Sequence, residues 1–567
     1  MRFSLLIAAA PLVLLAACAT VAPPQGAQAV NPAPAGETPY GMFLAGRGAL
    51  NDGKSAEAAQ YFDRARQASD PDPLIADQAF IAALLSGDVS KAAAIAPTSE
   101  DAAEGGKRLG KFVVAVEALA QGKGKQAQIL LSRDAIAFPH RPAAALLAPW
   151  AAAQAGDVAA SLVRPEVRGD QLVEYFGRIG QAFLFERAKR YDEAETDFKA
   201  AANGANASEM AILAYGGFLE RRGRRIDAVA LYGAAQVNDP NDSAIIAASR
   251  RATAGQPAPP LPTLREGAAQ VLLAPAAGMM EAKQTQLALA YLRLALRLDP
   301  QRDEAWVLVG DIMQGSGDTE AAREAYGHPK PGSIEYGAAQ AKLAWTYQAA
   351  DDKATALKLA RGAAASGDIG ARITLADLLR ADEQYAESIS VLSGLIAEAK
   401  RPDWRLIYAR GVAYGQMDRW PEAEADLQAA LTLQPDEPEL LNYLGYSWID
   451  RGQHLPEAMA MVEKAVGANP RSGAMVDSLG WAYYRLGQYK KAVDKLEEAV
   501  ELEAGDPEIN NHLGDAYWKA GRRDEAVFQW RRVLTLNPDA KIKAATEAKL
   551  SSGLGPDGGA PPKIAGK

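Results

Sequence analysis

Small and large apolar positions recur every 34 residues near the C-terminus of the chain. Each copy carries a leucine–glycine pair, then an aromatic residue, then an alanine and a large apolar residue. These positions are Leu479, Gly480, Tyr483, Ala492 and Leu496 in one copy, and Leu513, Gly514, Tyr517, Ala526 and Trp530 in the next. A period of this length, with small residues at fixed points, predicts stacked helical hairpins in which two antiparallel helices approach closely.

The same pattern continues toward the N-terminus. A small residue recurs with its later alanine at Gly46 and Ala58, Gly216 and Ala228, Gly310 and Ala322, Ala344 and Ala356, Gly411 and Ala423, and Gly445 and Ala458. Arg410 stands where a leucine is expected. The copies predict about a dozen hairpins between Thr38 and Asp539. No stretch shows the alternation of a β-strand, so the predicted fold class is all-α.

These residues resemble the tetratricopeptide repeat (TPR), whose motif places Leu-Gly and an aromatic residue in a first helix, and Ala and a large apolar residue in a second. A proline follows the second helix in that motif, and Pro538 stands at this position. The resemblance implies a superhelical TPR solenoid in which each hairpin contacts its neighbours. Such arrays usually act through a surface and not through a reaction centre.

Proline and glycine content suggests how the array is divided. The proline-rich segment Pro257–Pro262 is interpreted as a joint between two stacked halves, or as a loop between hairpins. The expected parts are an N-terminal TPR-like solenoid over 38–256, central repeats over 263–402, regular C-terminal repeats over 403–540, a capping helix over 541–552 and a disordered tail over 553–567.

The first residues of the chain have the character of an export signal. Residues 1–17 form an apolar run with one positive charge, Arg2, and are too short to span a bilayer comfortably. The run ends in a Leu-Ala-Ala-Cys sequence that resembles a bacterial lipobox, and Cys18 is the only cysteine. The resemblance implies a lipoprotein signal peptide over 1–17, a lipid on Cys18 and an Ala/Pro tether over 18–37. An ordinary signal peptide or an uncleaved anchor is the alternative.

Sorting rules of bacterial lipoproteins add an expected location. Ala19 and Thr20 follow the cysteine, and the lack of Asp at these positions favours the outer membrane, with the body of the protein facing the periplasm.

Charge and motif content limit the classes of function. The formal net charge is −9, so a clustered basic surface for nucleic acid is not expected. The densest basic run, Arg221–Arg225, is interpreted as a helix end and the following turn. The four histidines, His140, His328, His454 and His512, lack metal-ligand spacing, and no nucleophile elbow or phosphate loop occurs. The sequence predicts a non-enzyme with no cofactor or metal.

In TPR arrays the first helix of each hairpin lines a concave groove, and the resemblance transfers these positions to the C-terminal repeats. The predicted partner-binding residues are Tyr408, Asn442, Tyr446, Asp477, Trp481, Tyr484, Arg485, Asn511, Asp515 and Trp518, with Ile449 and Lys519 at equivalent positions. Amides can bond a peptide backbone, and aromatic faces supply contact area. For Trp481, Tyr484 and Trp518, packing against the neighbouring repeat remains an alternative to partner contact. Tyr414, Trp448, Tyr483 and Tyr517 occupy inward motif positions and are expected in the core.

Some cytosolic TPR domains clamp the C-terminal carboxylate of a chaperone with Lys and Asn at fixed groove positions. In this chain Asp477 and Trp481 occupy two of those positions. This departure, together with the export signal, argues against chaperone-tail binding.

The chain as a whole resembles the large TPR lipoproteins of Gram-negative envelopes. By architecture and location, it is similar to the adaptor lipoproteins that bind a periplasmic C-terminal processing protease and bring it cell-wall hydrolases. The resemblance implies a non-enzymatic, membrane-anchored scaffold or adaptor that binds envelope proteins or peptides. A passive scaffold for outer-membrane, peptidoglycan or polysaccharide-export assembly is one alternative, and an enzyme with an unrecognised site is another.

Overall fold

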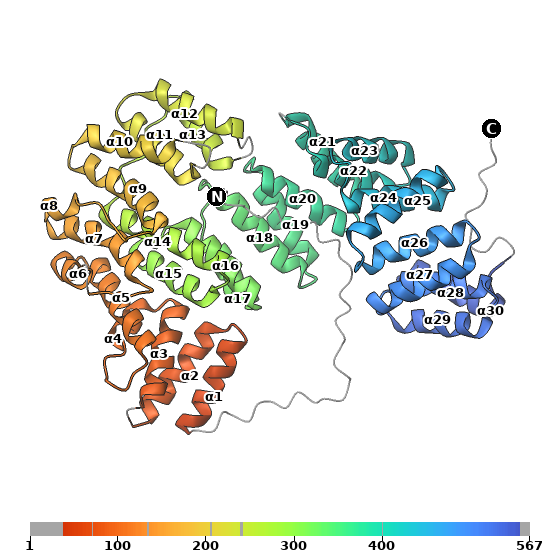
Figure 1. The fold of residues 1–567 in the computed structure, drawn as a ribbon, viewed down its shortest axis with the longest axis horizontal. Helices are drawn as coiled ribbons and strands as arrows, with labels where there is room; N and C mark the ends of the chain where they lie inside the picture. The colour runs from red at the N-terminus through yellow and green to blue at the C-terminus, as the bar shows by residue number, and fades with distance from the viewer. Residues whose placement is uncertain are drawn as a thin grey trace. The chain divides into compact units, whose positions relative to one another are not determined.

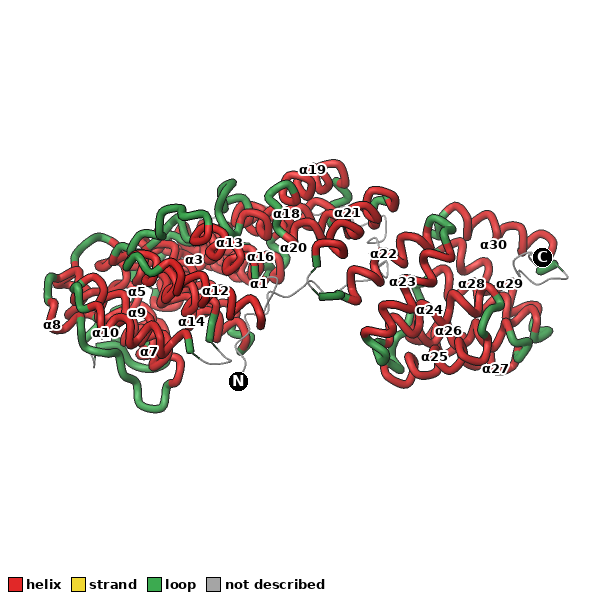
Figure 2. Tube along the Cα trace, turned by 90° about the horizontal axis from the view of Figure 1, so that it is seen from above, coloured by secondary structure: helices red, strands yellow, loops and turns green. Residues whose placement is uncertain are grey.

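The computed structural model describes residues 38–70, 72–132, 135–203, 207–238, 242–399 and 401–555. Over these residues the chain forms thirty α-helices joined by loops and contains no strand (Figures 1 and 2), which confirms the predicted all-α class. The predicted signal peptide, Cys18, the tether and residues 556–567 of the tail lie outside the described residues. Among the helices that are described, none is long and apolar enough to cross a membrane.

The described chain packs as two units, residues 38–378 and residues 379–555, with the boundary inside α20 (Ile369–Ala381). The other helices of unit 1 are α1 (Pro39–Asn51), α2 (Ser55–Ala68), α3 (Pro73–Ser86), α4 (Val89–Ala94), α5 (Glu104–Ala120), α6 (Gly124–Leu130), α7 (Arg141–Ala155), α8 (Val158–Ser161), α9 (Gln171–Arg187), α10 (Tyr191–Ala202), α11 (Glu209–Arg221), α12 (Arg225–Asn238), α13 (Ser243–Thr253), α14 (Leu264–Glu281), α15 (Thr285–Leu298), α16 (Asp303–Ser316), α17 (Thr319–Tyr326), α18 (Tyr336–Gln348) and α19 (Lys353–Ala364). The other helices of unit 2 are α21 (Tyr385–Glu398), α22 (Trp404–Gln416), α23 (Trp420–Leu433), α24 (Pro438–Arg451), α25 (Leu455–Ala468), α26 (Gly473–Arg485), α27 (Tyr489–Leu502), α28 (Pro507–Lys519), α29 (Arg523–Thr535) and α30 (Ala540–Ser552).

In the regular hairpins, a glycine of the first helix faces a large side chain of the second. A Cβ atom added to Gly480 would lie 2.6 Å from Leu496, and one added to Gly514 would lie 2.5 Å from Trp530. The same relation pairs Gly46 with Phe62, Gly216 with Tyr232, Gly310 with Tyr326, Gly411 with Leu427, and Gly445 with Val462. Because glycine has no Cβ atom, the large side chain of the second helix fills the space beside it. The two helices of each hairpin therefore pack closely against each other.

Turns between helices lie where glycine and aspartate predict them. Gly87 and Gly156 end α3 and α7 with φ of +100° and +82°, a left-handed conformation that glycine adopts without a Cβ clash. Asp88 and Asp157 follow and cap the next helices. The Asp157 carboxylate, for example, accepts a hydrogen bond from the Ala160 N–H at 3.0 Å.

Arg410, which replaces the expected motif leucine, makes a polar contact in place of apolar packing. Its guanidinium forms a two-point ion pair with Asp426 on α23, at 2.7 and 2.8 Å. It also donates to the Ser393 hydroxyl at 3.2 Å. The departure from the motif therefore ties α22 to both α21 and α23.

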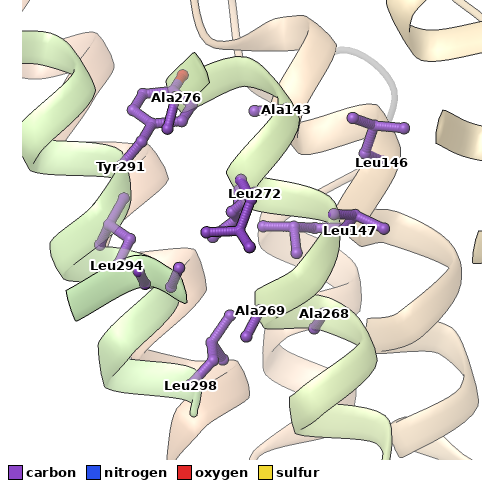
Figure 3. Close-up of a cluster of buried hydrophobic side chains, with 14 of the residues drawn as sticks. Ala143, Leu146, Leu147, Ala268, Ala269, Leu272, Ala276, Tyr291, Leu294 and Leu298 are labelled. Carbon is purple, nitrogen blue, oxygen red and sulfur yellow. The ribbon is translucent and has the colours of Figure 1, made fainter. Parts of the chain in front are cut away.

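Unit 1 differs from a simple series of hairpins because α14 and α15 return to its N-terminal helices. α14 packs on α7 and α9, and α15 packs on α3 and α5 (Figure 1). Figure 3 shows the apolar side chains at this contact, where Leu147, Leu272 and Leu294 are fully buried. Since α3, α5, α7 and α9 are neighbouring first helices, the returning hairpin fills the face that a TPR array ordinarily leaves open.

Two polar contacts fix the returning hairpin. Arg297 on α15 pairs with the buried Glu117 carboxylate on α5 at 2.8 Å. His140, next to α7, places Nδ1 2.9 Å from the Tyr291 hydroxyl on α15. Burial lowers the pKa of His140 to about 4, so the ring is neutral at physiological pH. It therefore adds a hydrogen bond to this core without adding a buried charge.

The proline-rich segment carries the chain from α13 back to these helices and lies inside unit 1. Arg187 donates to the Pro262 carbonyl, and Arg221 donates to the Pro259 carbonyl at 3.1 Å. The basic run Arg221–Arg225 spans the end of α11 and the start of α12, as expected. The segment is thus an anchored crossing. It does not join two halves that continue to stack end to end, and the repeat pattern gave no sign of the return.

Substitution of Gly267 on α14 tests how tightly α14 packs against α7. A Cβ atom there would lie 2.0 Å from the Trp150 ring on α7, so one helix must shift. We expect Gly267→Ala to destabilise unit 1 by about 2 kcal/mol. The measurement is hydrogen exchange of α7 and α14 peptides. Gly278→Ala is the matched control in the same helix, because its nearest neighbour is 3.8 Å away. Equal exchange in the two variants would contradict the packing described.

Candidate partner-binding face

The first helices α22, α24, α26 and α28 form one side of unit 2, which we call the first-helix face. α24 packs beside α26, and α26 packs beside α28. The ten predicted groove residues all lie on these four helices. The Tyr446 hydroxyl on α24 lies 3.5 Å from the Glu508 carboxylate on α28, across the intervening α26. A contact between the first and third of three neighbouring helices requires the face to be concave here.

A buried ion pair connects α26 and α28 at the centre of this face. His512 donates from Nδ1 to the Asp477 carboxylate at 2.9 Å, and both side chains are almost fully buried. Burial opposes protonation of the ring. The negative charges of Asp477, Glu508 and Asp515 nevertheless raise the pKa of His512 to about 9. The ring is therefore positively charged at neutral pH and holds the two helices in register.

Two aromatic rings stack in succession on the histidine of this pair. The Trp481 indole lies 4.1 Å from the His512 ring and 4.6 Å from the Tyr484 ring, nearly parallel to both. Trp481 and Tyr484 are each 6% exposed, so they pack within the wall of the face. Tyr483, which was expected in the core, is half-exposed, and Lys491 lies over its ring at 5.2 Å. Tyr484 is the more buried of the two because its ring packs on Trp481 and Tyr489.

Two buried polar atoms of the face, one on α24 and one on α26, lack partners among the described residues. Asn442 and Tyr446 are half-buried. The Asn442 Oδ1 and Trp481 Nε1 atoms are buried, and neither has a hydrogen-bond partner among the described residues. An unpaired buried polar atom costs about 1–3 kcal/mol. Both atoms are enclosed, so the accessible polar surface at the α24 end comes from the rest of the Asn442 and Tyr446 side chains.

Two other predicted residues at this end make intramolecular contacts. Tyr408 is 3% exposed and packs edge-on against Tyr443, with ring centres 5.9 Å apart. Arg485 donates to the Asp450 carboxylate at 3.3 Å. Both side chains therefore help to bind neighbouring repeats together.

At the opposite end, α30 contacts the predicted groove residues of α28. The Lys549 ammonium donates to Asn511 Oδ1 at 2.9 Å and to Asp515 Oδ2 at 2.7 Å. Gly553 follows α30 and lies so close to Trp518 that a Cβ atom on it would be 2.2 Å from the ring. The segment in which a capping helix was expected therefore lies on part of the groove itself.

The structure adds three residues to the sequence-based set: His512, Glu508 and Lys549. His512 follows Asp477 by 35 residues, one repeat plus one position, so repeat arithmetic could have placed the two side by side. Glu508 reaches Tyr446 only because the face is curved. Lys549 lies beyond the last repeat, where the pattern gives no register.

The His512 pair predicts a pH dependence. The pKa of His512 is higher in the folded state than its unfolded value of about 6.5. Protonation therefore stabilises the fold fully below about pH 6.5, and this contribution is lost as the pH rises through about 9. We expect unit 2 to lose up to about 3 kcal/mol over this range, measured by urea unfolding at each pH.

His512→Gln should flatten that dependence. His454→Gln, on an exposed histidine before α25, is the matched control and should leave it intact. A pH dependence that is the same in both variants would assign it to other groups.

Within the described part of the chain, no three His, Cys, Asp or Glu side chains are arranged to hold a metal ion.

Comparison with protein families shows matches in the C-terminal region. The family described as "TPR repeat" matches residues 480–521, and families described as "Tetratricopeptide repeat" match residues 408–473 and 507–540. No catalytic family is among these matches.

Similar proteins include a TPR repeat-containing protein of Pseudomonas aeruginosa, 26% identical over 215 residues, which are 38% of this chain and 36% of that protein. Human tetratricopeptide repeat protein 13 is 29% identical over 173 residues, which are 30% of this chain and 20% of that protein. The matched segments thus cover about a third of the Pseudomonas protein and about a fifth of the human protein.

Comparison with solved structures also gives matches. The Cut9–Hcn1 hetero-tetramer of the APC/C matches with a TM-score of 0.41 and 16% identity, over 91% of this chain and 96% of that one. A TPR protein from Parabacteroides merdae matches with a TM-score of 0.38 and 15% identity, over 44% of this chain and 98% of that one. On the family matches alone, residues 408–473 and 480–540 of this chain are tetratricopeptide repeats.

Proposed function

We propose that this protein is a non-enzymatic adaptor that binds envelope proteins through the first-helix face of unit 2. TPR proteins generally mediate protein–protein interactions, and this chain carries such repeats. The observation that most supports the proposal is the concave α24–α28 surface, where the Asn442 and Tyr446 side chains remain partly accessible. An extended segment or helix of a partner protein would pack on this accessible part of the face.

Lipid on Cys18 would fix the adaptor to the outer membrane, with its body in the periplasm. The proposal is supported by the lipobox-like sequence and by the absence of a second cysteine that could compete for modification. More than one acyl chain gives firm anchoring, whereas one alone binds only marginally. Confinement at the membrane would raise the local concentration of any bound partner.

The partner proposed for the adaptor is a periplasmic C-terminal processing protease together with its clients. An adaptor that holds both would speed cleavage by proximity, without a catalytic group of its own. A passive scaffold for envelope assembly would use the same face but would bind assembly proteins and leave proteolysis unchanged.

The anchor is tested by Cys18→Ser. We expect this variant to move from the membrane fraction to the soluble fraction, because the lipid has no other attachment point in the chain. Fractionation and mass spectrometry of the N-terminal peptide measure the change. Ser4→Ala, in the same segment, should stay in the membrane fraction. An unchanged distribution of the Cys18→Ser protein would refute the lipid anchor.

The binding face is tested with Tyr446→Ala in the full-length protein. We expect about a tenfold loss of partner capture, which corresponds to about 1.4 kcal/mol, because a partly accessible aromatic contact is removed. In-cell cross-linking with mass spectrometry measures the captured proteins. Phe528→Ala is the matched control, because Phe528 is 65% exposed but lies on a second helix, α29.

The identity of the captured proteins separates the two functions. A captured processing protease, with faster cleavage of its clients, supports the adaptor. Capture of assembly proteins alone, with protease activity unchanged, supports the scaffold. Equal capture by the Tyr446 and Phe528 variants would show that partners bind elsewhere.

A further inference from the structure

Helix α30 shows what the α28 end of the first-helix face can hold. The Lys549 ammonium enters a site made by Asn511 Oδ1 and Asp515 Oδ2, at 2.9 and 2.7 Å. The Asp515 side chain is only 3% exposed and the Lys549 side chain 14%. The Trp530 indole N–H also donates to Asp515 at 2.9 Å, which fixes the carboxylate in place. The site therefore holds an amine through two oxygen acceptors, and one of them is a buried carboxylate that Trp530 orients.

The rest of α30 buries little surface. Only Thr546 is buried along the helix, while Leu550 and Leu554 are partly buried against the core. Its other positions are mostly exposed. α30 also packs on α29, the helix before it. Because little apolar surface is covered, the contacts of Lys549 and of the following leucines are what tie α30 to the α28 end of the face.

We propose that this end of the face is a docking site for a partner's amphipathic helix that carries a lysine, and that α30 occupies it as an intramolecular competitor. The proposal rests on the proposed function, because it names the kind of partner that the same face would bind. A partner helix would place its amine between Asn511 and Asp515 and its apolar residues over Trp518, where Gly553 now lies.

Charge complementarity supports a basic partner over an acidic one. One repeat earlier, the Asp477 carboxylate accepts a cation, His512, from the next helix in the array. Asp515 accepts Lys549 in the same way from the helix that follows its own repeat. The same kind of ion pair therefore occurs twice on this face. In each case a buried carboxylate on a first helix pairs with a positively charged side chain from a helix packed beside it.

The test uses the full-length protein and a labelled peptide of residues 539–554, which is α30 itself. We expect the peptide to bind the Lys549→Met protein about tenfold more tightly than the wild type, because the internal competitor is released. Lys543→Met, on an exposed lysine of the same helix, is the matched control and should behave as the wild type. A peptide with Lys549→Met should bind about tenfold more weakly than the natural peptide.

Fluorescence anisotropy measures binding, and circular dichroism verifies that the variants keep their helicity. Should Lys549→Met unfold unit 2, Leu550→Ser provides a second way to loosen α30 while keeping the amine. Equal affinity of the two peptides would overturn the amine site. Equal binding to the wild-type and loosened proteins would overturn competition by α30.

Cross-linking in cells separates this inference from the proposed function. Lys549→Met should raise partner capture about threefold or more. If Tyr446→Ala abolishes capture while Lys549→Met leaves it unchanged, the face binds partners but α30 does not compete. If the loosened protein only forms dimers by exchanging α30, a second copy is the occupant and the partner-helix proposal fails.

Discussion

The packing of a glycine against a large side chain about sixteen residues later is the contact on which every regular hairpin depends. Gly480 with Leu496 and Gly514 with Trp530 show how little room remains between the paired helices. Because this contact closes the hairpin internally, the outer surface of each first helix is not needed to hold its own pair together. That surface is free for a further chain, and the two units use it differently.

In unit 1 the further chain is part of the protein. The hairpin α14–α15 covers α3, α5, α7 and α9, and its leucines and alanines complete the largest apolar core of the described residues. In unit 2 the surface stays polar and partly accessible around Asn442 and Tyr446, while α30 packs on α29 and, among the first helices, reaches only α28. Hairpins closed by the same glycine contact therefore form a filled body in unit 1 and a partly open first-helix face in unit 2. The difference lies in which helices pack on the first helices.

Local relationships were predictable from the sequence, and distant ones were not. The glycine and alanine spacings predicted the hairpins, and Gly87-Asp88 and Gly156-Asp157 predicted turns, because these features depend on residues close in sequence. The return of α14 to α7 depends on shape matching between Gly267 and Trp150, more than 100 residues apart. The repeat spacing predicts only contacts between adjacent repeats. It therefore placed Asn511 and Asp515 on the face but could not show that Lys549 reaches them.

The order of residues along the chain has a consequence for biogenesis. Helices α3 to α9 leave the ribosome, and any export channel, before residues 264–298 that complete their core. Until those residues arrive, the apolar surfaces around Leu147 and Trp150 face solvent, and such surfaces promote aggregation during synthesis. The core of unit 1 is thus completed only when residues 264–298 reach the helices made before them.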